Sequence, residues 1–152
     1  MRIEFTIPAV PVAQPRQRHR IISSGGMSFA NNYTPTKHPV NAFKASARMA
    51  LESAYKGAPL VGPLAMSVVF VFPRPTNRVW KSKPMPRERH TKKPDCDNLL
   101  KSLKDSLSGL AYADDAQICE YREVTKWIAS GDEQPHVEVT IEDLDATTGG
   151  DT

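Results

Sequence analysis

The 152-residue chain is poor in cysteine and has no long apolar run. Its two cysteines, Cys96 and Cys119, lack the spacing of metal ligands, and no secretion signal precedes them. We therefore expect reduced, partly buried thiols rather than a disulfide or a zinc site. No segment approaches the roughly 20 apolar residues that span a membrane. These absences predict a cytoplasmic protein that does not bind membranes.

Acidic residues are scarce in the first part of the chain. Residues 1–93 hold 16 Lys and Arg against three acids, whereas residues 94–152 hold four against 14. Each part supplies only some strands of the expected sheet, so the two should fold together and place a basic surface beside an acidic cluster. That pairing suits a polyanion that is held while metal ions act on it. A merely solvated charged surface is the alternative.

Length and hydrophobic periodicity predict a single α+β domain over residues 1–144, followed by a disordered tail at 145–152. We expect two layers, a mixed β-sheet with helices on one face, in the order β-α-β-α-β-β. The expected elements are a strand at 2–8, a helix from Pro39 to Gly57, a strand at 64–72, a helix from about Cys96 to Ser108, and strands at 117–128 and 135–142. The last two strands are expected to form a hairpin through residues 130–132.

Two segments are unusual in composition. Residues 11–38 are rich in Pro, Arg, Ser, Gly and Asn, which predicts a mobile loop or a small hairpin around Gly25 and Gly26. Residues 73–94 hold eight Lys or Arg, one Glu and five prolines, and we expect no regular structure there. The second segment leads directly into the second helix.

The start of that helix carries two carboxylates, Asp95 and Asp97. Viewed alone, the helix has a purely structural explanation: Asp95 caps it, Asp97 favours its dipole, and Lys101 pairs with Asp97. A second acidic pair, Asp114 and Asp115, changes this view. A near-extended return through residues 110–113 could just bring Asp115 back to the helix start. A carboxylate from a partner subunit is the other possibility.

Three gathered carboxylates would repel one another without a cation. Hard oxygen ligands beside a lysine suit Mg²⁺, with Mn²⁺ as a possible substitute, and the four scattered histidines are not assigned to a metal. Asp95, Asp97 and Asp115 are therefore the candidate ligands for metal-assisted phosphodiester hydrolysis. Lys101 could orient the attacking water or offset charge on the transition state.

These residues form two linked motifs. The first is P-D-x-D-N-x-x-K, from Pro94 to Lys101, and the second is D-D-x-Q, from Asp114 to Gln117. Together with Tyr33-Thr34-Pro35 they resemble the RusA family of Holliday junction resolvases over about residues 1–143. The chain departs from shorter members of that family in its longer, proline-broken basic segment at 73–93.

The resemblance implies a homodimer that binds four-way DNA junctions and cuts symmetrically placed phosphodiesters with Mg²⁺. It implies catalytic roles for Asp95, Asp97, Asp115 and Lys101. Asn98 and Asp114 match the motifs as well, and we assign them supporting roles.

Basic side chains of the two unusual segments are expected to contact the DNA backbone. The candidates are Arg16, Arg18, Arg20, Arg78, Lys81, Lys83, Arg87, Arg89, Lys92 and Lys93. We count His90 as one more possible phosphate contact among them, while Trp80 could stack on a base or pack against the domain. Two other functions stay open: a non-catalytic basic DNA-binding module, and a hydrolase of free nucleotides.

Overall fold

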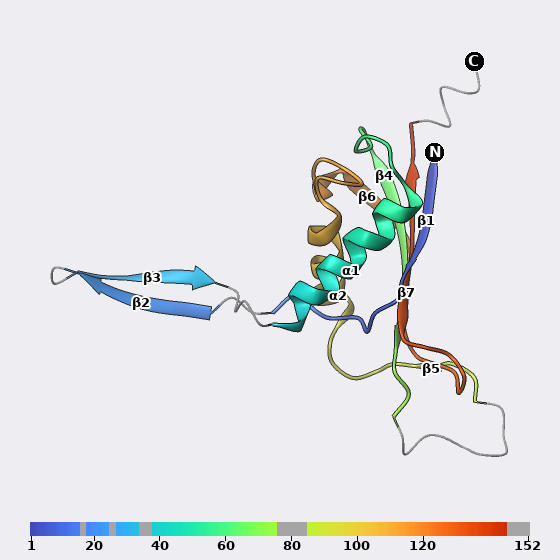
Figure 1. Ribbon diagram of the computed structural model, residues 1–152, viewed down its shortest axis with the longest axis horizontal. Helices are drawn as coiled ribbons and strands as arrows, with labels where there is room; N and C mark the ends of the chain where they lie inside the picture. The colour runs from blue at the N-terminus through green and yellow to red at the C-terminus, as the bar shows by residue number, and fades with distance from the viewer. Residues whose placement is uncertain (16–17, 25–26, 34–37, 76–84, 146–152) are drawn as a thin grey trace.

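Five strands form one mixed sheet in the order β1-β7-β4-β6-β5 in the computed structural model (Figure 1). The structure describes residues 1–15, 18–24, 27–33, 38–75 and 85–145. The strands of this sheet are β1 (Arg2–Ile7), β4 (Leu64–Phe72), β5 (Glu88–Arg89), β6 (Ile118–Ile128) and β7 (His136–Asp143). β4 runs parallel to β6 and antiparallel to β7, and the other pairs are antiparallel. The predicted mixed sheet is confirmed.

Alternating side chains place the core on one side of this sheet. In β1, Ile3, Phe5 and Ile7 are buried and the residues between them are exposed. β4 is the most apolar strand, and most of its residues are buried on both faces, as expected of a central strand. The buried cluster therefore lies between one face of the sheet and the helices.

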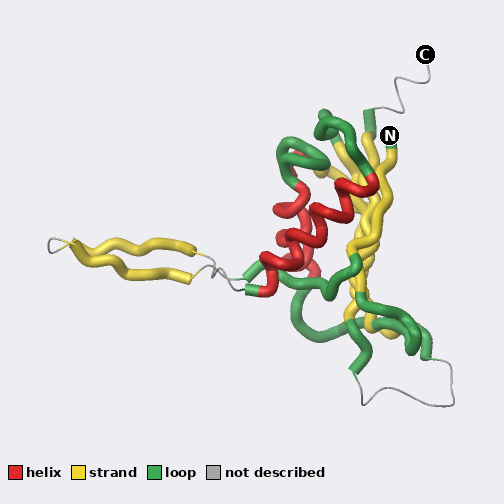
Figure 2. Tube along the Cα trace, in the orientation of Figure 1, coloured by secondary structure: helices red, strands yellow, loops and turns green. Residues whose placement is uncertain are grey.

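Two helices cover that face (Figure 2). α1 (Pro39–Ala54) begins at its cap His38, whose Nδ1 accepts a hydrogen bond from the Val40 N–H, and it buries Val40, Phe43, Ala47 and Leu51. α2 (Cys96–Leu107) buries a leucine stripe. The two helices also contact each other, since the Arg48 side chain donates to the Ser106 carbonyl at 2.9 Å. The predicted α+β domain with two layers is confirmed.

The segment at 11–38 contains a hairpin, as one of the two predicted possibilities. β2 (Arg18–Ser24) pairs antiparallel with β3 (Met27–Tyr33), from Arg18 opposite Tyr33 to Ser24 opposite Met27. This hairpin forms a two-stranded sheet of its own and stands away from the main sheet (Figure 1).

Two sequence predictions about the strands are wrong. β6 and β7 do not pair as a hairpin, because β4 lies between them and pairs with both. Because β4 is apolar on both faces, it occupies the centre of the sheet. The connection from β6 to β7, which begins after Ile128, therefore crosses the end of β4. Residues 73–94 are not wholly irregular either, since Glu88 and Arg89 pair with Ile128 and Trp127.

The other predictions about organisation concern the ends and the membrane. No helix in the described ranges is long and apolar enough to cross a membrane. Of the expected tail at 145–152, only Asp145 belongs to the described residues.

Candidate active site

The helix α2 begins with the first candidate pair. Asp95 is in an extended conformation, and its Oδ1 accepts a hydrogen bond from the Asn98 N–H at 3.1 Å, which makes it the helix cap. Asp97 lies in the first turn, and both carboxylates are exposed. Asp95 caps the helix and Asp97 lies in the first turn, as the structural explanation requires, but in the described part of the chain Asp97 and Lys101 form no ion pair. Asp97 and Lys101 remain available to a ligand.

A lysine from the sheet holds the segment that leads into this helix. Nζ of Lys126, on β6, donates to the carbonyls of Lys92 and Pro94, both at 2.8 Å. On the other side, the Gln14 N–H donates to the Asn98 carbonyl at 3.0 Å. The helix start is therefore fixed from two directions. Sequence reasoning missed Lys126, because a lysine on a strand gives no signal of which carbonyls it will meet.

The second acidic pair lies in a corner built by Gln117. Asp114 caps a short 3-10 turn (Asp115–Gln117) and accepts from the Ala116 N–H at 3.0 Å. Gln117 Oε1 accepts from the Ala113 and Asp114 N–H groups, each at 3.0 Å. Its Nε2 donates to the carbonyls of Leu60 and Gly62 at 3.0 and 3.1 Å. The D-D-x-Q motif is thus a corner tied to the loop before β4.

The extended return from α2 to this corner does not form. Instead the chain turns tightly at the helix end, with Gly109 at φ 87°, and its N–H donates to the Tyr112 carbonyl at 2.7 Å. Tyr112 is fully buried, and its hydroxyl donates to the Lys104 carbonyl at 2.9 Å. The tyrosine anchors the loop near the last turn of α2, where the sequence alone allowed an extended path.

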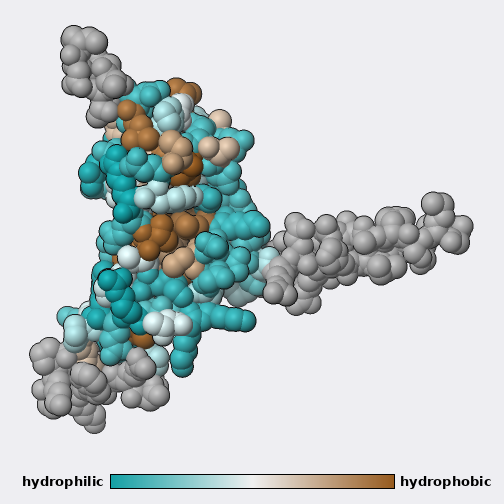
Figure 3. Space-filling model, turned by 180° about the vertical axis from the view of Figure 1, so that it is seen from behind, coloured by the Kyte–Doolittle hydropathy of each residue, from teal (hydrophilic) through white to brown (hydrophobic). Residues whose placement is uncertain are grey.

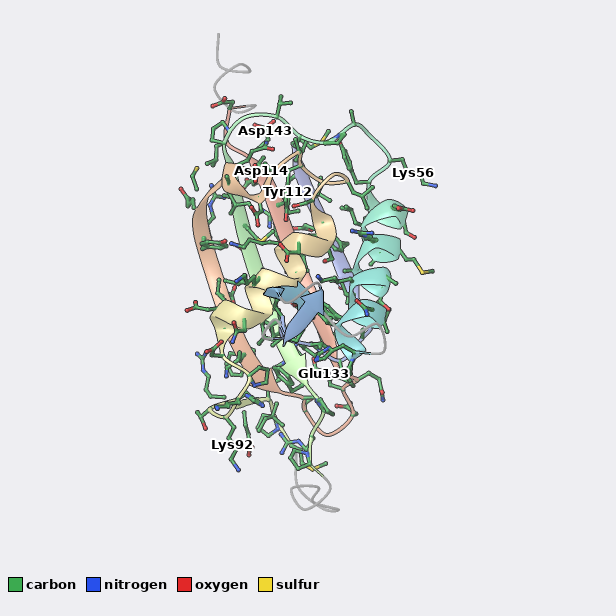
Figure 4. All side chains as sticks on the ribbon, turned by 90° about the vertical axis from the view of Figure 1, so that its left-hand side faces the viewer. Lys56, Lys92, Tyr112, Asp114, Glu133 and Asp143 are labelled. Carbon is green, nitrogen blue, oxygen red and sulfur yellow. The ribbon has the colours of Figure 1, made fainter. Side chains whose placement is uncertain are left out.

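Asp115 consequently lies at the C-terminal end of α2, opposite Asp95 and Asp97. Tyr121, and after it the charges of Asp115 and Asp105, raise the pKa of Lys104, which places Asp115 near the last turns of the helix. Figure 4 shows Asp114 and Tyr112 at one end of the domain and Lys92, just before α2, at the other. Of the two possibilities that the sequence left open, the extended return that would gather the three carboxylates in one chain is not formed in the described structure, and their role as metal ligands stays a prediction.

The donor chemistry nevertheless fits a hard divalent cation. Asp95 has one carboxylate oxygen that capping does not use. The carboxylates of Asp97 and Asp115 form no hydrogen bond or ion pair with other described residues. Oxygen donors of this kind suit Mg²⁺ or Mn²⁺. Among the residues that the structure describes, no group of three His, Cys, Asp or Glu side chains could hold a metal ion. The other possibility that the sequence left open, a carboxylate from a partner subunit, stays a prediction.

The predicted DNA-binding residues fall into four groups. Arg87 binds both oxygens of Glu133 and one of Glu138, and Arg89 lies 3.9 Å above the Trp127 ring. These two arginines therefore have contacts within the domain. Lys92 and Lys93 are exposed beside the start of α2. Arg18 and Arg20 lie on β2, and the candidates outside the described residues are Arg16, Arg78, Lys81 and Lys83, together with Trp80.

Comparison with known proteins assigns the chain to a class of DNA nucleases. A family described as "Endodeoxyribonuclease RusA" matches residues 8–142, and the chain belongs to this family. It is also 32% identical over 150 residues to "Uncharacterized protein YqaN" of Bacillus subtilis (strain 168), an alignment that covers 95% of this chain and 98% of that protein. Membership in the family implies endonuclease activity of the Holliday junction resolvase type.

Proposed function

We propose that this protein is a Mg²⁺-dependent endonuclease that resolves Holliday junctions by paired phosphodiester hydrolysis, in DNA recombination and repair or in phage DNA processing. The observation that carries the proposal is the start of α2. There Asp97 and Lys101 share a helix face, exposed and unpaired within the described residues, next to the partly free carboxylate of Asp95. The two side chains have the i, i+4 spacing of an ion pair but form none among the described residues, so both charged groups are open to a ligand.

Asp95, Asp97 and Asp115 would hold the cation, which supplies an activated water and a polarised phosphate when bound. Mn²⁺ could substitute for it. Lys101 lies one helical turn from Asp97 and brings an ammonium group to offset negative charge on the phosphate. Asn98 supports the site through its N–H, which fixes the Asp95 carboxylate. Asp114 supports it by capping the turn that presents Asp115.

The proposal includes a homodimer whose two chains complete each other's sites. Asp95 and Asp97 lie at one end of α2 and Asp115 at the other, and 12 residues of helix span about 18 Å. A two-fold axis across the middle of α2 would bring the helix start of one chain beside the Asp115 corner of its partner. Both sites would then form by the same contact, as two-fold symmetry requires.

Two features of the surface support an association of this kind. Along β6, β5 covers only Trp127 and Ile128, so residues 118–125 form a sheet edge without a paired strand among the described residues. Such edges are templates for pairing with another chain. The face seen from behind, which contains the α2 and β6 side of the domain, carries a central apolar patch within a hydrophilic surface (Figure 3).

The test is cleavage of a synthetic four-way junction beside a linear duplex of matched sequence, with and without Mg²⁺. We expect wild-type protein with Mg²⁺ to cut the junction in preference to the duplex, and Asp97→Asn to bind the junction without cutting it. Asp132→Asn, which changes an exposed carboxylate in the β6 to β7 connection, serves as the matched control and should cut normally. Binding without cleavage in Mg²⁺ or Mn²⁺ would instead identify a DNA-binding module. Turnover of free nucleotides would identify a nucleotide hydrolase.

A further inference from the structure

A pocket of about 300 Å³ lies beside the segment that leads into α2. Its walls combine the apolar residues Pro73, Pro75 and Ile128 with the polar residues Arg89, His90 and Lys92. Nothing in the sequence motifs or in the proposed metal site uses it. The mixture of apolar walls and cations differs from a surface that only contacts phosphates, which needs no apolar part.

His90 is the fixed polar group of this pocket. Its ring stacks on Phe72, with centroids 4.3 Å apart and planes inclined by 23°. Its backbone N–H donates to the Lys126 carbonyl at 3.2 Å. The Nδ1 atom is buried and has no hydrogen-bond partner in the described structure. An enclosed atom does not contact a ligand in the pocket, and the backbone of His90 and Lys92 acts on the same ring. The surrounding protein therefore fixes the ring, and only its remaining edge can meet a ligand.

The surroundings of the His90 ring also disfavour its charged form. Burial, and next the charge of Lys126, lowers the pKa of His90 below its ordinary value of 6.5. At neutral pH the imidazole is therefore neutral, with one nitrogen that accepts and one that donates. A neutral aromatic ring with hydrogen-bonding nitrogens suits a base better than a phosphate.

The pocket is held rigidly to the proposed catalytic carboxylates. Four residues lie between His90 and Asp95, so the Cα atoms of the two are five residue steps and at most about 18 Å apart. Nζ of Lys126 donates to the Lys92 and Pro94 carbonyls, which lie between His90 and Asp95 in the sequence, and the Lys126 carbonyl accepts from the His90 N–H. A DNA strand whose phosphate sits at Asp95 and Asp97 would pass the pocket within a few nucleotides.

We propose that this pocket receives one unstacked base of the junction strand, a few nucleotides from the cut phosphodiester, and so selects where the strand is cut. Apolar walls take the base, the His90 ring supplies hydrogen bonds to its edge, and Arg89 and Lys92 meet the adjoining phosphates. Unpaired nucleotides at a junction centre make such extrusion less costly than in a duplex. This inference deepens the proposed function and rests on it.

The first experiment needs no cleavage. Junctions carrying a single 2-aminopurine at successive positions around the crossover are titrated with Asp97→Asn protein. We expect fluorescence to rise several-fold at one position, as that base leaves its stack, and the rise to be lost when His90→Ala is added. Lys44→Ala, on the opposite helix, is the control and should keep the rise. Junction binding with no rise at any position, or an unchanged rise in His90→Ala, would overturn the proposal.

The second experiment uses cleavage. A set of junctions with varied bases around the crossover is cut by wild-type protein and by His90→Phe, a change that preserves the stacking on Phe72 and therefore the fold. We expect wild type to cut some junction sequences at least ten-fold faster than others. His90→Phe should still cut, but with a much smaller difference in rate between sequences. Equal preference in the two proteins would refute the inference. Absence of any cutting alongside a fluorescence rise would count against the nuclease and not against the pocket.

Discussion

The ion pair between Arg87 and Glu133 gives a pH prediction at the scale of single residues. The Arg87 hydrogen bonds, with help from the Ser130 N–H, lower the pKa of Glu133 from 4.5 to about 2. A depressed acid stabilises the fold above its ordinary pKa, and that stability is lost as pH falls from about 4.5 to about 2. Both side chains are partly exposed, so we expect Glu133→Gln to reduce the free energy of unfolding by about 1 kcal/mol at pH 7.

Urea unfolding at pH 7, 4 and 2.5 measures this difference. The difference in free energy of unfolding should be largest at pH 7 and shrink at each lower pH. As Glu133 becomes protonated, wild type loses the charged pair with Arg87, which the variant lacks at every pH. Asp132→Asn, in the same connection, should differ little from wild type at pH 7. A Glu133→Gln difference that stays constant across the three pH values would contradict the role given to the carboxylate.

Gln117 gives a second prediction, since one amide joins two segments. Gln117→Glu preserves an acceptor for the Ala113 and Asp114 N–H groups but has no donor for the Leu60 and Gly62 carbonyls. We expect the variant to lose about 1–3 kcal/mol of stability, which is the cost of leaving such groups unpaired or facing a charge. Thermal unfolding measures the loss. The control is Glu120→Gln, the opposite exchange at an exposed position, which should change the melting temperature little. Equal melting temperatures of wild type and Gln117→Glu would show that the corner does not depend on the amide.

Some residue roles could be predicted from sequence and others could not. The cap at Asp95 follows from its position before an amphipathic run, and the structure confirms it. The roles of Lys126 and His90 depend on which loop packs against the end of β6. No local pattern encodes that neighbourhood, so only the folded chain reveals it.

At the scale of elements, Asp95 has two separable tasks. Asparagine caps a helix about as well as aspartate but has no negative charge for a cation. We expect Asp95→Asn to keep its melting temperature within a degree or two and to lose most junction cleavage. Asp95→Ala should lose cleavage and about 1 kcal/mol of stability as well. The pair of variants is compared by thermal unfolding and by junction cleavage in Mg²⁺, and full activity of Asp95→Asn would remove this carboxylate from the metal site.

Periodicity predicted the individual elements better than their arrangement. Both helices and the main strands lie where the apolar pattern places them, because each buries one face. The strand order could not be predicted in the same way, because it depends on which strand occupies the centre of the sheet. That strand is β4, which lies between β7 and β6. The path after α2 depended on whether Tyr112 would be buried, and a single aromatic residue in a seven-residue connection (108–114) does not predict this.

At the scale of the whole molecule, the proposed composite site predicts complementation between two inactive variants. In a heterodimer of Asp97→Asn and Asp115→Asn chains, one site carries both changes and the other carries neither. Mixing the two proteins, after dissociation and reassociation, should therefore restore cleavage that neither shows alone. The restored activity should cut a single strand for each binding event, since only one site of the pair works.

Gel analysis of supercoiled cruciform plasmid measures this result, with nicked circles expected from the mixture and linear product from wild type. Light scattering on the same samples should give the mass of two chains. Mixtures that stay inactive although heterodimers form would place all three carboxylates in one chain, and a monomer at all concentrations would rule out the shared site.

The pairing of β1 with β7 has a consequence for biosynthesis. The first strand of the chain finds its partner in the last, from Arg2 opposite Glu142 to Ile7 opposite Val137. A nascent chain that has emerged only as far as α2 already carries Asp95 and Asp97, yet its sheet lacks both the strand beside β1 and the Asp115 corner. We therefore expect the proposed nuclease to become active only after residues 136–143 have been translated and have closed the sheet.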